Sequence, residues 1–162
     1  MKLYLLTIFL LLSITVISQT QNSTERYRIT QFKENGKNVT KEYKGKEQYL
    51  LFFENEKNES CFAIGSQITK EKSYGVIHLN DSKKNIQTKD NCSAETINFR
   101  WKYRNSYDSV CGYATNTFTK IFTEPIVSFH CIMATQDLVV YEYSGYMEKP
   151  AEYFNETELA KR

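Results

Sequence analysis

The clearest pattern in the chain is the alternation of apolar and polar residues over positions 96–105. Ile97, Phe99, Trp101 and Tyr103 are each separated by one polar or basic residue. A period of two places the aromatic residues on one face of a strand, whereas a helix would spread them around its whole circumference. We therefore predict a strand with one face on a core and the other face in water.

Shorter segments elsewhere show related patterns. The predicted strand 26–32 is followed by Asn35-Gly36, the favoured pair for a tight hairpin because both residues tolerate a positive φ. This pair predicts a return strand over 38–43. Residues 48–53 are apolar on both faces, which is typical of a strand in the middle of a fold. Apolar runs bounded by turn residues predict further strands over 61–64, 74–79, 113–122, 126–133 and 138–143.

Two other segments lack a strand pattern. Residues 80–91 are polar, with Ile86 as the one large apolar side chain, and predict a solvated loop. Near the C-terminus, Pro150 and Glu152 favour the start of a helix, and Lys161 and Arg162 favour its end. A short helix is therefore predicted over 151–160.

This succession of short strands predicts a mainly β fold. Such a meander must close into a barrel or pack as two sheets, because open strand edges invite aggregation. Sequential hairpins favour a small antiparallel up-and-down β-barrel, with a β-sandwich as the alternative. The order of elements is similar to that of calycin-type barrels, the relatives of lipocalins, in architecture only. The lipocalin Gly-x-Trp motif is absent, since Tyr27-Arg28-Ile29 occupies its place and Trp101 is the only tryptophan.

The N-terminal segment has the features of a signal peptide. Lys2 precedes an apolar run over 3–17, and polar residues follow Ser18, where cleavage is expected. The run is shorter than the roughly 20 apolar residues that span a bilayer, although an uncleaved anchor is the alternative. We therefore expect a signal peptide over 1–18 and a single β-rich domain over 19–162. The product is expected to be soluble and secreted, either extracellular or periplasmic, without a membrane anchor.

Four cysteines follow the predicted signal peptide. An even number of cysteines in an exported chain predicts two disulfides. Of the three pairings, we favour Cys61–Cys92 with Cys111–Cys131. The cysteines are too widely spaced for the close pairs of a zinc site, so no metal or other cofactor is expected.

Charge and catalytic motifs give little indication of function. The formal net charge of +2 gives no reason to expect nucleic acid as a partner. No nucleophile or paired acid accompanies His78 and His130, so we expect no enzyme. A secreted hydrolase is the third hypothesis, with His78 as its candidate residue. We expect His130 to point outward and His78 to be half-buried.

The aromatic residues provide the first two hypotheses. If the barrel is wide enough, its interior is an apolar pocket for a small hydrophobic ligand. The candidate ligand contacts are Tyr49, Leu51, Phe53, Phe99, Trp101 and Tyr103. Alternatively, these side chains fill the core. The protein would then be an extracellular structural or protein-interaction module, with an exposed patch formed by Tyr141, Tyr143 and Tyr146.

Overall fold

The computed structural model describes residues 24–89, 92–123 and 125–148, so the predicted signal peptide and the predicted C-terminal helix lie outside the described residues. The described residues form nine strands and one 3₁₀ helix, η1. Their bounds are β1 Glu25–Glu34, β2 Lys37–Asn38, η1 Thr40–Tyr43, β3 Gln48–Glu54, β4 Ser60–Ser66, β5 Lys72–Lys89, β6 Cys92–Asn105, β7 Cys111–Thr123, β8 Ile126–Thr135 and β9 Val140–Glu148.

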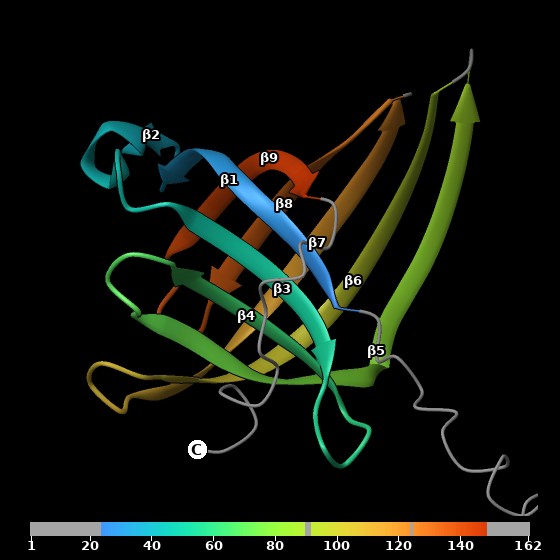
Figure 1. Ribbon diagram of the computed structural model, residues 1–162. Coiled ribbons are helices and arrows are strands. Elements are labelled where there is room, and N and C mark those ends of the chain that lie inside the picture. The colour runs from blue at the N-terminus through green and yellow to red at the C-terminus, as the bar shows by residue number, and fades with distance from the viewer. Residues whose placement is uncertain (1–23, 90–91, 124, 149–162) are drawn as a thin grey trace, which may run out of the picture.

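Eight of these strands form one closed antiparallel barrel (Figure 1). The order is β1-β3-β4-β5-β6-β7-β8-β9, and β9 pairs again with β1. The short strand β2 adds to the other side of β1. The prediction of a mainly β, up-and-down barrel is confirmed, and the alternative of two packed sheets is wrong because the single sheet closes on itself.

The hairpin at Asn35-Gly36 is confirmed, but its return strand is shorter than predicted. Asn35 and Gly36 have φ values of 49° and 79°, as a tight two-residue turn requires. Pairing continues only to Asn38, and η1 follows. The Thr40 hydroxyl accepts a hydrogen bond from the Phe32 amide at 2.9 Å and donates one to the Phe32 carbonyl at 3.2 Å. A side chain thus replaces the partner strand and ends the ladder.

The polar segment 80–91 is not the loop that the sequence predicts. β5 runs to Lys89 and β6 begins at Cys92, so most of the segment is strand. β4 pairs with β5 only from Lys72 to Val76, and the distal part of the β5–β6 hairpin projects beyond the barrel (Figure 1). Ile86, in this projection, is 64% exposed. A hairpin without a core beneath it has no apolar alternation, and the sequence pattern therefore resembles that of a loop.

The barrel interior is densely packed in one half. Tyr27 is fully buried, and its ring centroid lies 5.0 Å from that of Phe118 and 5.3 Å from that of Phe129. The Tyr27 hydroxyl donates to the Glu25 carboxylate at 2.7 Å, and Lys120 Nζ also lies 2.7 Å from that carboxylate. This end of the barrel is therefore filled by aromatic rings and closed by an ion pair.

Both preferred disulfide pairings are wrong. Cys61, Cys111 and Cys131 have free thiols. Cys131 pairs across the sheet with Phe118, seven residues along β7 from Cys111, or about 23 Å at 3.3 Å per residue. Cys61 lies in register with Val76 and thus with Lys102, about 33 Å along β6 from Cys92. A disulfide requires Cα atoms within about 7 Å, so neither pair can form a bond. The position of each cysteine along the barrel depends on strand register, which the spacing of cysteines in the sequence does not reveal.

The thiols should instead differ in reactivity. Cys111 is exposed, whereas Cys61 and Cys131 are buried. Burial, assisted by Glu59, raises the pKa of Cys61 to about 11, and burial also raises the pKa of Cys131. Because the thiolate is the reactive form, we expect iodoacetamide at pH 8 to label Cys111 in the native protein.

Cys61 and Cys131 should react only in denaturant, as mass spectrometry of the digested protein would show. Rapid labelling of Cys131 in the native protein would contradict its burial. Failure to label Cys111 before reduction would instead indicate a disulfide.

Candidate functional site

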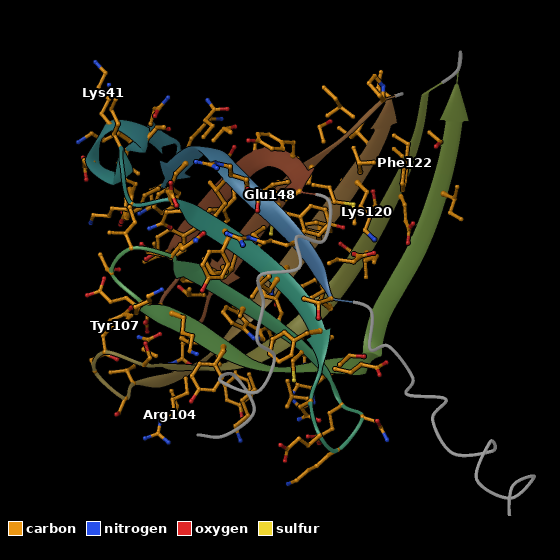
Figure 2. All side chains as sticks on the ribbon, in the orientation of Figure 1. Lys41, Arg104, Tyr107, Lys120, Phe122 and Glu148 are labelled. Atoms are coloured by element: carbon orange, nitrogen blue, oxygen red, sulfur yellow. The ribbon has the colours of Figure 1, made fainter. Side chains whose placement is uncertain are left out.

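The other half of the barrel is open and contains a cavity of about 410 Å³, which we call the cup. It lies at the end where the β4–β5, β6–β7 and β8–β9 connections turn, and η1 borders it. Figure 2 shows Tyr107 at this end, and Lys120 and Phe122 toward the opposite end of the barrel. The volume is within the range of small-molecule sites, which is about 300–1,000 Å³.

Seven aromatic side chains line the cup together with polar and charged residues, and they come from β1, η1, β6, the β6–β7 connection and β9. They are Phe32, Tyr43, Trp101, Tyr103, Tyr107, Tyr141 and Tyr143. Several of these rings hold one another in place. Phe32 stacks on Tyr143 with ring centroids 4.8 Å apart, and the Tyr43 ring meets the Phe32 ring edge-on with centroids 4.6 Å apart. The wall is therefore built of rings that are already packed in position.

The boundary between the cup and the packed half lies at Trp101 and Met133. Both line the cup, but they are only 1% and 6% exposed. Below them, Phe62 is fully buried, and its ring centroid lies 5.0 Å from that of Trp101 and 5.3 Å from that of Phe99. The filled core and the cavity, which are alternatives at the level of sequence, thus each occupy one half of the barrel.

The tyrosine hydroxyls of the cup remain protonated at neutral pH. Burial raises the pKa of all five, which are Tyr43, Tyr103, Tyr107, Tyr141 and Tyr143. Nearby carboxylates act in the same direction, such as Asp137 on Tyr103 and Glu34 on Tyr43. Neutral phenols both donate and accept hydrogen bonds, so the cup presents polar groups within an aromatic wall.

Charged residues of both signs lie at the cup. Lys46, Lys72, Glu71 and Asp137 contribute to its lining. The Lys46 ammonium lies 5.0 Å from the centre of the Tyr43 ring, and Lys72 lies 5.5 Å from the ring of Tyr74. Because the two signs balance, the cup has no strong overall preference for an anion or a cation.

The structure separates the six predicted ligand contacts into two groups. Trp101 and Tyr103 line the cup, and Phe99 belongs to the same interior cluster. The prediction that the other three share this interior is wrong. Tyr49 and Leu51 belong to a second cluster with Ala63, against which Phe53 packs.

The physical reason is that β3 is apolar on both faces. Leu50 belongs to the interior cluster, and Phe52 packs against that cluster. Tyr49 and Leu51 alternate with these residues, so they lie on the opposite face of β3. A strand without polar positions gives no indication of which face is inside. The sequence therefore identified a buried strand but assigned its faces the wrong way round.

Sequence reasoning missed most of the cup residues on β1, η1 and β9. Tyr141 and Tyr143 were assigned to an exposed patch with Tyr146, but Tyr143 is 5% exposed and Tyr146 is 39% exposed. The alternation along β9 places Tyr141 and Tyr143 inside and Tyr146 outside. Because the first two share a face with Met147 rather than with Tyr146, the period-two pattern contained the signal. Tyr43 reaches the cup through η1, for which the sequence has no clear signal.

The histidines lie outside the cup. His130 points outward, as predicted, and its Nε2 lies 3.7 Å from the Glu142 carboxylate, which also binds Lys33 at 2.9 Å. His78 is exposed rather than half-buried. Within residues 24–89, 92–123 and 125–148, no three His, Cys, Asp or Glu side chains are placed to share a metal ion.

Comparison with known proteins adds no functional information. No family model, curated protein or solved structure matches the chain significantly. In the part of the chain that the structure describes, no helix has the length and apolar character needed to cross a membrane. A functional proposal must therefore depend on the geometry of the cup.

Proposed function

We propose that this chain is a secreted, soluble binding protein that holds a small, largely apolar ligand in the cup. The supporting observation is that one half of the barrel is packed and the other half contains an open cavity of about 410 Å³ to which seven aromatic side chains contribute. Protein interiors are otherwise close-packed, because unfilled volume forfeits dispersion contacts. A cavity of this size whose lining combines aromatic rings with polar groups that fix orientation is a common form of a small-molecule site.

The physical properties of the cup limit the ligand. Each buried CH₂ group contributes about 0.8 kcal/mol, so aromatic or aliphatic surface supplies most of the affinity. The cavity volume of about 410 Å³ favours a compact ligand over a long chain. The five tyrosine hydroxyls then set its orientation through hydrogen bonds. The balanced charges in the lining of the cup support an uncharged or weakly polar ligand.

Two neighbouring tyrosines provide a matched test of the cup. Tyr107 and Tyr113 are 59% and 51% exposed, but only Tyr107 lines the cup. Using the uncharged fluorophore N-phenyl-1-naphthylamine as the probe, we expect Tyr107→Ala to weaken binding about fivefold, since one aromatic contact contributes about 1 kcal/mol. Tyr113→Ala should leave the affinity unchanged. Titration of probe fluorescence measures both, and equal effects would place the probe outside the cup.

Native mass spectrometry of the protein purified from its own host tests the proposal without a chosen probe. A small molecule that copurifies, and that the Tyr107→Ala variant retains less well, would support binding in the cup. The intact mass also shows whether residues 1–18 have been removed, as secretion requires. A protein that carries no ligand and binds no apolar probe would contradict the proposed function.

A further inference from the structure

Two buried polar atoms next to the cup have no hydrogen-bond partner. They are the indole Nε1 of Trp101, a donor, and the amide Oδ1 of Asn116, an acceptor. Trp101 is 1% exposed and Asn116 is fully buried. The Asn116 amide nitrogen makes only one long hydrogen bond, of 3.5 Å, to the carbonyl of Ala114. The two orphaned atoms therefore offer one donor and one acceptor.

These two side chains share the interior face of the barrel. Asn116 pairs across the sheet with Phe99 on one side and Met133 on the other, and both partners belong to the interior cluster. Trp101 pairs with Ala114, two residues before Asn116 on β7. Trp101 and Asn116 are thus diagonal neighbours, whose backbones lie about 7–8 Å apart. One small polar group has the right size to contact both.

Two neighbours of this pair line the cup. The Tyr103 ring lies over Trp101 with centroids 4.9 Å apart at a tilt of 34°. Met133 lies beside Asn116, and both Tyr103 and Met133 line the cup. Methionine is flexible and adapts its shape to its neighbours. Because Trp101 itself also lines the cup, the pair lies at the boundary between the cavity and the packed half.

An unpaired buried polar group is unfavourable, because its lost hydration is not replaced. An apolar residue at position 116 would fill the same space without this penalty. The polar pair is therefore better explained by a partner that the apolar neighbours do not supply. A ligand group or a trapped water molecule can act as that partner.

The surroundings select against a charged partner at this depth. Among the described residues, the charged side chains of the cup lie in its lining at Lys46, Lys72, Glu71 and Asp137. The Glu25–Lys120 ion pair closes the opposite end of the barrel. An ionised group beside Trp101 and Asn116 would thus be buried without a counter-ion, which is strongly unfavourable. The matching group is neutral.

We propose that the cup selects a ligand whose inner end is an uncharged group with both an acceptor and a donor, such as a carboxamide or a lactam. Trp101 Nε1 donates to the oxygen of this group, and its N–H donates to Asn116 Oδ1. The apolar body of the ligand lies against the aromatic wall. This inference rests on the proposed function, because it specifies the ligand class for the same cavity.

A matched series of four naphthalenes tests the inference by isothermal titration calorimetry. The 2-substituents are carboxamide, acetyl, ethyl and carboxylate, so the ring body is constant and only the polar group changes. We expect the carboxamide to bind about tenfold more tightly than the ethyl compound. The acetyl compound should be intermediate because it accepts but does not donate, and the carboxylate should be weakest.

Variants assign the effect to the two side chains. In Asn116→Leu, the carboxamide should lose its advantage over the acetyl compound, while the ethyl compound binds as it does to the unaltered protein. In Trp101→Phe, the acetyl compound should lose its advantage over the ethyl compound. Asn116→Leu removes an unpaired polar group, so its melting temperature should not fall, and the comparison is made on a folded protein.

The outcomes separate this inference from the proposed function. Equal affinities for the carboxamide, acetyl and ethyl compounds would overturn the inference, as expected if water occupies the pair, but would leave binding in the cup intact. Tightest binding of the carboxylate would also overturn it. If Asn116→Leu still preferred the carboxamide to the acetyl compound, Asn116 would not be the acceptor for the ligand N–H, and the inference would be overturned. Absence of binding by all four compounds would contradict the proposed function and the inference together.

Discussion

Replacing Phe118 by alanine should lower the free energy of unfolding by about 3–5 kcal/mol, the usual cost of truncating a buried aromatic side chain. Phe118 is fully buried in the packed half of the barrel. Its ring centroid lies 4.8 Å from that of Phe52, 5.0 Å from that of Tyr27 and 5.5 Å from that of Phe129. Strands of a closed barrel cannot move inward to fill the resulting void. Urea denaturation followed by the fluorescence of Trp101 measures the loss.

Phe122 is the matched control, because it lies on the same strand, four residues further along, but is 37% exposed. Phe122→Ala should change the free energy of unfolding by no more than about 0.5 kcal/mol. Phe118 does not line the cup, so a folded Phe118→Ala protein should still bind a probe there. Equal destabilisation by the two substitutions would contradict the division of the barrel into a packed half and an open half.

The sequence predicted the barrel because its strongest signals are local. The alternation through Phe99, Trp101 and Tyr103 correctly assigns the inner face of β6, since one face of this strand is apolar and the other is charged. The turn at Asn35-Gly36 is equally local, because the two positive φ values depend on these residues alone. A chain of such hairpins leaves few architectures without open edges, and a barrel is one of them.

The features that the sequence did not predict depend on tertiary context. The strand through Leu50 and Leu51 has no polar face, so only the register with its neighbours determines which residue points inward. The polar part of β5 around Ile86 projects beyond the barrel, so its sequence lacks the apolar alternation of a strand that packs on a core. The cysteines occupy different levels of long strands, and their levels depend on register rather than on spacing along the chain.

The cup combines both kinds of information. Trp101 and Tyr103 could be placed inside from their own strand, whereas Tyr43 lines the same cavity because η1 follows the short strand β2. The cavity exists because the side chains that point into this half of the barrel do not fill its interior. Absence of filling is not encoded by any single residue, so a sequence pattern could not decide between a filled and an open barrel.

The closure of the barrel depends on a close approach at Gly145. This residue lies in β9 opposite Ile29 of β1. A Cβ atom added there would lie 1.8 Å from the carbonyl oxygen of Arg28 and 2.9 Å from the Phe129 ring. Backbone cannot rotate out of the way as a flexible side chain can. Gly145→Ala should therefore separate β1 from β9 and lower the free energy of unfolding by about 3 kcal/mol or more.

A second glycine distinguishes this clash from the general effect of replacing glycine. At Gly36 nothing lies within 4 Å of an added Cβ, but φ is +79°. Gly36→Ala should cost only about 1–2 kcal/mol, the penalty of a left-handed conformation. Hydrogen exchange locates the larger effect: in Gly145→Ala, the amides that join β1 to β9 should exchange faster, whereas those between β6 and β7 keep their protection. Because β1–β9 is the pairing that turns the sheet into a barrel, unchanged exchange there would mean that the two strands do not approach as closely as the clash requires.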